Sequence, residues 1–358
     1  MRRLRGKGGF SPTDHGRCFK RLQSLNCGNG PDTLTLQAHR LGDRAFWFGY
    51  TLQRTLKSPV SFDGIGLHSG KPVRITVRPA MAEQGIWFRR TDINIGDALV
   101  PARWDIVEQS PLCTKLVNAS GVSVSTVEHL MAALAGCGIH NAMIDIDGPE
   151  VPILDGSAAP FVQAFLARGT IGLRSPVRAV EILDTVEFRT DHGFARLTPA
   201  DTLRIDFAID FEDAAIGHQA KSLTMSNGSF VRELCDSRTF CRQADVDTMQ
   251  ANGLALGGQA GKNAVVFDGD SVVSPGGLRH ADEPVRHKML DALGDLALAG
   301  GPIIGQYTGV RAGHSMTNSL LRKLFVTPGA FRMVECRGPV AARLPGVGVH
   351  MGEMPAVA

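Results

Sequence analysis

The spacing of apolar residues divides most of the chain into strands and helices. Alternating β-branched and polar residues predict two strands, at 55–62 and 72–78, around a glycine-rich turn at 64–70. The same pattern predicts further strands at 141–146, 180–188, 195–198, 203–211 and 303–308. Apolar residues three and four positions apart predict helices at 125–134, 160–166, 245–252, 284–298 and 316–325. Strands that come in clusters and are followed by helices indicate an α+β fold in each half of the chain.

The length of 358 residues is typical of two domains. A turn-rich stretch at 169–176 is the expected boundary, which gives a first domain at 51–172 and a second at 177–350. The two halves have similar lengths and a similar order of elements, although no repeat is visible by residue identity.

Composition and charge exclude several classes of protein. The chain is 43% hydrophobic and 20% charged, so each domain can bury a core, and disordered, collagen-like and coiled-coil proteins are disfavoured. The seven cysteines form no Cys-x-x-Cys pair, which argues against a disulfide scaffold or zinc ribbon and favours a reducing cytoplasm. No apolar run approaches the roughly 20 residues that span a bilayer.

The first 50 residues differ from the rest. They hold nine of the 38 Lys and Arg residues but only three of the 35 Asp and Glu residues, so the net charge of +3 originates entirely there. A basic surface for nucleic acid is therefore not expected on the remainder. We predict that residues 1–50 are a disordered extension, or sequence upstream of the true start. The alternative is that the basic and aromatic run 44–50 contacts anionic lipid or phosphate.

The most informative segment is 283–296, which covers most of the helix predicted at 284–298. At 100° per residue, four ionisable residues fall on one side, opposite a wide apolar face. They are His287, Lys288, Asp291 and Asp295. The His-x3-Asp spacing places an imidazole and a carboxylate one turn apart, so that both can bind one metal ion. A solvated helix face with a His287–Asp291 pair is the alternative.

A second candidate segment surrounds Glu128 and His129. Ser125 lies three residues before Glu128, a spacing that fits a capping box and explains the glutamate without any function. His129 precedes an apolar helical run and is either a core histidine or a metal ligand. Metal hydrolases need three protein ligands, an open position and a carboxylate that accepts a proton from water.

A third candidate is His314, in the glycine-bounded loop 309–318. A histidine there can protonate a leaving amine, or it is simply solvated. The neighbouring Ser315 lacks the second glycine of a nucleophile elbow. The glycine-rich stretch 256–263 has the wrong spacing for a Walker A motif, and no Ser or Thr follows Lys262, so we interpret it as an ordinary loop.

The order and spacing of six motifs together resemble the UDP-3-O-acyl-N-acetylglucosamine deacetylase family, the zinc amidases that commit precursor to lipid A synthesis in Gram-negative bacteria. The resemblance covers the chain from about Leu52 to its end. The motifs are Gly-Ile-Gly-Leu-His-Ser-Gly-Lys at 64–71, Ser-Thr-Val-Glu-His-Leu-Met-Ala-Ala-Leu at 125–134, Pro-Ile-Leu-Asp-Gly-Ser-Ala-Ala-Pro-Phe at 152–161, Ser-Arg-Thr-Phe at 237–240, Val-Arg-His-Lys-Met-Leu-Asp-Ala-Leu-Gly-Asp-Leu at 285–296 and Ala-Gly-His at 312–314.

The resemblance implies a fold and an active site. It implies two similar α+β domains with helices packed between two sheets, each domain with a small insert and the site at their junction. It implies Zn²⁺ as the metal, although Fe²⁺ is also compatible with two histidines and an aspartate. The implied roles are metal ligand for His129, His287 and Asp291, general base for Glu128, general acid for His314, orientation of His314 for Asp295, and stabilisation of the oxyanion for Lys288 and Thr239.

The resemblance also implies substrate contacts. His68 and Arg311 are expected near the diphosphate, and Phe211 and Phe240 near the nucleotide. Arg311 stands where the family has a lysine, which keeps the charge and changes the geometry. Cys241-Arg242 replaces the Gly-Phe that the family often has here, which leaves open whether an aromatic side chain contacts the nucleotide at this point.

Two further features follow from the resemblance. The insert near 242–272, with Leu254, Ala255 and Leu256, is expected to form an apolar passage for the acyl chain. Cys113 matches a cysteine that the family places near the site, and an inert buried thiol is the alternative.

The expected reaction is removal of the N-acetyl group from a UDP-linked, 3-O-acylated N-acetylglucosamine, with release of acetate. We expect a cytoplasmic monomer that has no nucleic-acid partner. A peripheral contact with a membrane is compatible with this expectation. Two other classes remain: a binding protein that holds a lipid-linked nucleotide without chemistry, and a zinc amidase that acts on another acetylated sugar.

Overall fold

A computed structural model of the protein describes residues 46–47, 50–94, 96–110 and 112–355. Most of the predicted extension, including all but three residues of the basic and aromatic run 44–50, lies outside the described residues. Its last part is described as β1 (Phe46–Trp47), which pairs antiparallel with the start of β2 (Tyr50–Leu56). None of the described helices is long and apolar enough to cross a membrane.

The first half of the chain forms a five-stranded sheet, an insert and two helices. The sheet strands are β3 (Val60–Ile65), β4 (Pro72–Pro79), β5 (Ile86–Arg90), β6 (Leu99–Pro101) and β10 (Ala142–Ile146). The insert between β6 and the first helix contains a 3-10 turn (Trp104–Ile106), β7 (Val107–Glu108), β8 (Lys115–Val117) and β9 (Ser123–Ser125). The helices are α1 (Glu128–Gly136) and α2 (Ala159–Arg168), and β11 (Thr170–Pro176) ends this half.

The second half repeats this plan. Its sheet strands are β13 (Val186–Thr190), β14 (Gly193–Thr198), β15 (Arg204–Asp210), β16 (His218–Thr224) and β21 (Gln306–Val310). Its insert contains α3 (Ser229–Glu233), β17 (Phe240–Arg242), α4 (Gln243–Ala251), β18 (Val265–Asp268) and β19 (Ser271–Val272). The remaining elements are β12 (Arg178–Ile182), α5 (Glu283–Ala297), β20 (Ile303–Ile304), α6 (His314–Val326), β22 (Phe331–Glu335), α7 (Gly338–Ala342) and a 3-10 turn (Met351–Glu353).

The two large sheets have the same topology. The strand orders are β3-β4-β10-β5-β6 and β13-β14-β21-β15-β16. In each sheet the middle strand is the last to be added, and it pairs antiparallel on one side and parallel on the other. In each half one helix comes before that strand and another follows it. The two halves are therefore similar in structure, which identity along the sequence does not reveal.

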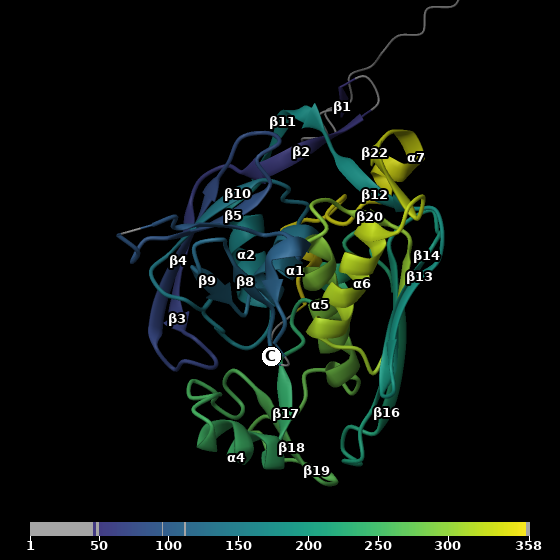
Figure 1. The fold of residues 1–358 in the computed structure, drawn as a ribbon. Coiled ribbons are helices and arrows are strands. Elements are labelled where there is room, and N and C mark those ends of the chain that lie inside the picture. The colour runs from purple at the N-terminus through teal and green to yellow at the C-terminus, as the bar shows by residue number, and fades with distance from the viewer. Residues whose placement is uncertain (1–45, 48–49, 95, 111, 356–358) are drawn as a thin grey trace, which may run out of the picture. The chain divides into compact units, whose positions relative to one another are not determined.

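Helices α1, α2, α5 and α6 form the layer between the two sheets (Figure 1). They bury their apolar faces in one hydrophobic core to which both halves contribute, from Leu56 to Ala330. The expected α+β fold with helices between two sheets is confirmed. Because α1 and α5 pack against each other at the centre of this layer, residues far apart in the sequence meet there.

Three sequence-based predictions of local structure are wrong. The strand predicted at 55–62 is two strands, β2 and β3, because the segment 57–59 contains Pro59, which has no N–H to donate to a ladder. The strand predicted at 180–188 is likewise divided into β12 and β13. The turn-rich stretch at 169–176 is largely β11, which pairs antiparallel with β2, and only Gly169, with φ of 72°, turns the chain.

Candidate metal centre and active site

The site lies where the first turn of α1 meets α5. Gly294 on α5 faces the backbone of Glu128, and a Cβ added at Gly294 would stand 2.1 Å from the Glu128 carbonyl oxygen. This close approach brings Glu128 and His129 beside the ionisable face of α5. That face is not solvated, since His287, Asp291 and Asp295 are only 2%, 4% and 3% exposed. The alternative of a surface His–Asp pair is therefore wrong.

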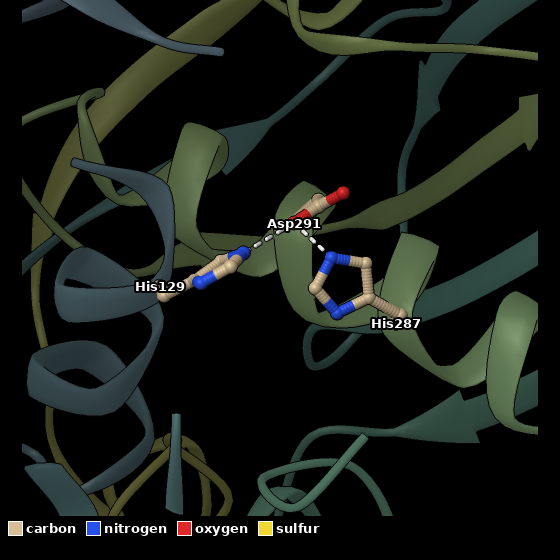
Figure 2. Close-up of side chains that lie close together, drawn as sticks. All are labelled: His129, His287 and Asp291. Atoms are coloured by element: carbon tan, nitrogen blue, oxygen red, sulfur yellow. Dashed lines mark ion pairs between the residues drawn. The ribbon is translucent and has the colours of Figure 1, made fainter. Parts of the chain in front are cut away.

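His129, His287 and Asp291 point toward one another (Figure 2). Asp291 Oδ1 lies 3.3 Å from His287 Nε2 and 3.5 Å from His129 Nε2, and this buried oxygen has no hydrogen-bond partner. Ligand atoms bound at about 2.1 Å from a tetrahedral ion stand about 3.4 Å apart. The three side chains therefore fit one divalent metal ion, and the orphaned oxygen fits a missing positive charge.

The ring of His287 is held in an orientation that suits metal binding. Its Nδ1 lies 3.0 Å from the carbonyl oxygen of Ser237, so this nitrogen carries the hydrogen and Nε2 keeps its lone pair. Burial lowers the pKa of His287 to about 4, which keeps the imidazole neutral. Next to Ser237, the guanidinium of Arg238 binds the carboxylate of Glu283 at the start of α5, which fixes this segment to the helix.

The second oxygen of Asp291 is held by Lys288, whose Nζ donates a hydrogen bond of 2.7 Å to Oδ2. Burial alone would raise the pKa of Asp291, but neighbouring His287 and Lys288 outweigh it and hold that pKa well below its usual range. Burial likewise opposes the charge of Lys288, yet Asp291 raises the pKa of Lys288 overall. Asp291 is thus ionised, as a metal ligand must be.

Glu128, His314 and Asp295 line the edge of this cluster. His314 lies at the start of α6, and its Nδ1 stands 2.9 Å from Asp295 Oδ2. Its Nε2 lies 3.8 Å from Glu128 Oε1 and 3.9 Å from Asp291 Oδ2. The predicted pairing of Asp295 with His314 is therefore present.

Burial and charge set the protonation of these groups. Burial raises the pKa of Glu128, although His314 and His129 oppose the rise. For His314, burial works against the charged form, but the carboxylates of Asp295 and Glu128 outweigh it and raise its pKa to about 9. At neutral pH His314 is therefore protonated, and it lies beside a carboxylate whose pKa is raised.

The capping-box interpretation of Glu128 is wrong. Helix α1 begins at Glu128 itself, and the Ser125 hydroxyl donates to the Pro149 carbonyl oxygen instead of capping the helix. The cause is Thr126, whose φ of 57° turns the chain sharply and whose hydroxyl is held by Glu150. The carboxylate of Glu128 consequently points to the cluster.

Thr114 also contacts the cluster, and the sequence does not indicate it. Its backbone N–H donates to Glu128 Oε2 at 3.0 Å, and its hydroxyl donates to Asp295 Oδ1 at 2.5 Å. Its partners are 14 and 181 residues away, and Thr114 lies outside any periodic segment, so no sequence pattern could have indicated it. The neighbouring Cys113 is buried, and burial, together with the charge of Glu128, raises the pKa of its thiol to about 12, which keeps the thiol protonated.

His68 lies in the turn between β3 and β4. Glu150 holds this turn by accepting the backbone N–H groups of His68 and Ser69, at 2.8 and 2.9 Å. Both ring nitrogens of His68 are buried without a partner. Burial lowers the pKa of His68 although the charge of Glu150 opposes this, and the charge of His314 adds to the lowering.

The aromatic residues reach the cluster from the second half. Phe240 lies edge-on to His287, with ring centroids 6.3 Å apart, and Phe211 lies edge-on to Phe240 at 5.6 Å. Thr239 is half-buried, and its backbone binds Gly156 and Val265. Arg242 is paired with Asp245 at 2.8 Å and Asp213 at 3.6 Å.

Arg311 directly follows the last residue of β21, three residues before His314. It is exposed and has a φ of 51°, a strained conformation for a residue with a side chain. The structure shows its backbone N–H bound to the Ala208 carbonyl oxygen, which holds this turn.

The insert of the second half approaches His68. The N–H of Leu256 donates to the His68 carbonyl oxygen at 3.2 Å, and that of Gly257 donates to the Leu67 carbonyl oxygen at 2.9 Å. Leu254 and Leu256 are exposed, whereas Ala255 is buried. The stretch 256–263 is a loop, as predicted.

A buried His–His–Asp cluster flanked by a carboxylate and a protonated histidine is typical of hydrolases that activate water. The profile of the UDP-3-O-acyl N-acetylglycosamine deacetylase family (LpxC) matches residues 53–326, and the chain belongs to this family. Three relatives carry the name UDP-3-O-acyl-N-acetylglucosamine deacetylase. That of Anaeromyxobacter sp. (strain Fw109-5) is 45% identical, over 83% of this chain and 98% of its own length. Those of Phenylobacterium zucineum (strain HLK1) and Pasteurella multocida (strain Pm70) are 46% and 44% identical, over 78% and 79% of this chain and 96% and 92% of their own lengths.

Proposed function

We propose that the protein hydrolyses the N-acetyl group of UDP-3-O-acyl-N-acetylglucosamine, giving UDP-3-O-acyl-glucosamine and acetate, the committed step of lipid A biosynthesis. One observation carries this proposal: the unpartnered, buried Oδ1 of Asp291 faces the Nε2 atoms of His129 and His287, with Glu128 and His314 at the edge. Membership of the deacetylase family and the names of the relatives support the choice of reaction.

The metal is proposed to be Zn²⁺, held by His129, His287 and Asp291, and Fe²⁺ is compatible with the same donors. When bound, the ion lowers the pKa of water and polarises the amide carbonyl. The neutral state of His287 and the ionised state of Asp291 suit this binding, because ligands must be deprotonated.

Glu128 is the proposed general base. Its Oε2 accepts the N–H of Thr114, so Oε1 is the oxygen that takes a proton from the attacking water. The pKa of Glu128 is raised by burial, which brings its basicity closer to the working pH and favours proton transfer.

His314 is the proposed general acid. The oxygen of water adds to the amide carbon, the carbon–nitrogen bond breaks, and the sugar amine takes the proton from Nε2 of His314. Asp295 holds Nδ1 and keeps the ring charged before the transfer.

During the reaction, negative charge develops on the oxygen of the amide carbonyl, and hydrogen-bond donors are needed to stabilise it. An ammonium has three donors, and Lys288 uses one of them on Asp291, so others remain for the substrate. The hydroxyl of Thr239 is proposed as a second donor. Thr239 lies two residues after Ser237 in the sequence, and the carbonyl oxygen of Ser237 orients the ring of His287.

Substrate binding is proposed to use local groups, because the net positive charge of the chain originates in residues 1–50 and not in the rest. His68 and Arg311 would contact the diphosphate, and Phe211 and Phe240 the nucleotide. The insert at 242–272, with exposed Leu254 and Leu256, would hold the acyl chain. The contact of this insert with the His68 turn supports the placement of both groups at one site.

We also propose that 51–172 and 177–350 act as two domains of a cytoplasmic monomer, with residues 1–50 dispensable for activity. The complete five-stranded sheet in each half supports the division into domains. A peripheral membrane contact would be compatible with this arrangement.

The test is acetate release by the purified protein from three substrates: UDP-3-O-acyl-N-acetylglucosamine, UDP-N-acetylglucosamine and N-acetylglucosamine. Rapid release from the first alone is expected. Binding of the acylated nucleotide without acetate release would instead identify a binding protein. Equal rates with all three substrates would identify an amidase with another substrate.

A further inference from the structure

We infer that Thr114 is a positioning residue that sets which oxygen of Asp295 and of Glu128 faces the reacting groups. Thr114 lies just before β8, outside both helices that carry these carboxylates, and it is 3% exposed. It contacts the first residue of α1 and a residue near the end of α5. The inference rests on the proposed function, because it concerns the proposed base and the partner of the proposed acid.

The hydroxyl of Thr114 decides the orientation of Asp295. It donates to Oδ1 at 2.5 Å, and this leaves Oδ2 for Nδ1 of His314 at 2.9 Å. A carboxylate that accepts a single hydrogen bond can rotate about the side-chain torsion that orients its oxygens. Two hydrogen bonds, one to each oxygen, fix the plane of the carboxylate. A fixed Asp295 in turn directs Nε2 of His314 toward Glu128 and Asp291.

The backbone of Thr114 decides the orientation of Glu128. Its N–H donates to Oε2, and Oε1 therefore faces His314. The carbonyl oxygen of Thr114 also accepts the N–H of Val127, one residue before Glu128. A side-chain substitution at Thr114 removes the contact with Asp295 and keeps the N–H donor that holds Glu128, so the two effects can be separated.

The test compares variants of the full chain loaded with metal. Thr114→Val keeps the shape and the N–H but removes the hydroxyl, and a fall in kcat of about 10- to 100-fold is expected, with KM and metal content close to wild type. Thr114→Ala loses the same donor without placing a methyl group against Oδ1 and carries the same expectation. Thr114→Ser, which keeps the hydroxyl, should restore most of the activity.

A matched control is Thr55→Val. Thr55 is a buried threonine of β2 whose hydroxyl also makes two hydrogen bonds, to Asn141 and Ala80. This variant should lower Tm without lowering kcat. If Thr114→Val and Thr55→Val lower Tm alike and leave kcat at the wild-type value, Thr114 has only a structural role and the inference is overturned.

A double variant tests whether Thr114 acts through Asp295. If it does, Thr114→Val should cost almost nothing in the background of Asp295→Asn, since neighbouring groups of one network are not additive. Two fully additive losses would overturn the inference. A wild-type protein that releases no acetate would refute the proposed function instead, so the two failures are distinguishable.

Discussion

Gly294 lies against the backbone of Glu128, so close that the Cβ of any other residue would stand 2.1 Å from the Glu128 carbonyl oxygen. This contact joins the two halves of the molecule at the site, since Glu128 starts α1 in the first half and Gly294 belongs to α5 in the second. Each half supplies residues of the cluster, and neither half holds the whole cluster: His129 comes from the first half, and His287 and Asp291 come from the second.

The first prediction concerns this contact. Gly294→Ala should separate α1 from α5, destabilise the fold by about 1–3 kcal/mol and reduce activity more than stability alone explains, because His129 moves away from Asp291. Thermal unfolding and acetate release measure the two effects. Gly352→Ala, in the exposed 3-10 turn near the end of the chain, is the control. A Gly294→Ala protein with wild-type Tm and activity would refute the close contact.

The second prediction concerns the metal ligands. Asp291→Asn removes a charged ligand while keeping the size of the side chain, so bound zinc measured by elemental analysis should fall well below one per chain. Asp245→Asn is the matched control, because Asp245 is an acidic residue on α4 that pairs with Arg242 away from the cluster. Zinc retained in full by Asp291→Asn would remove this residue from the ligand set.

The third prediction separates the base from the metal. Glu128→Gln keeps an oxygen that can accept the Thr114 N–H but loses the basic group, so kcat should fall about 10²- to 10⁴-fold while zinc content stays near one per chain. The same samples provide both measurements. Activity close to wild type would show that another group accepts the proton of water.

The fourth prediction concerns pH. Glu128 must be ionised and His314 protonated, so kcat/KM should rise through the raised pKa of Glu128 and fall as the pH passes the His314 pKa of about 9. Among the carboxylates, Asp295 contributes most to the raised pKa of His314. Asp295→Asn should therefore move the alkaline limb of the profile to lower pH. The profile from pH 5 to 10 checks both statements. An alkaline limb that does not move in Asp295→Asn would contradict the pairing.

The sequence contains the proposed metal ligands, but it does not show that they lie close together in the fold. Helical periodicity alone places His287, Asp291 and Asp295 on one face of α5. That this face is buried, and that His129 completes the cluster, depends on the packing of α1 on α5, which a periodicity of one helix cannot reveal. The proposed roles came from the resemblance to a family, and they fit the arrangement that the structure shows.

Predictions from local sequence patterns were wrong where contacts with distant parts of the chain determine the local structure. Ser125 and Glu128 satisfy the capping-box pattern, but Glu150 holds Thr126 in a left-handed conformation and Ser125 binds Pro149 instead. The stretch 169–176 has turn composition and still forms β11, because β2 offers it a pairing edge. The sequence does not indicate the contacts of Thr114, because both of its partners, Glu128 and Asp295, are distant in the sequence.

The most direct test of the account is zinc reconstitution of the chelated full-length protein, with acetate release from UDP-3-O-acyl-N-acetylglucosamine as the signal. The account predicts negligible release without metal and a rise in rate that reaches its plateau at one Zn²⁺ per chain. The same titration of Asp291→Asn should give a much weaker response. Full activity in the metal-free protein, or no acetate at any zinc concentration, would contradict the central claim.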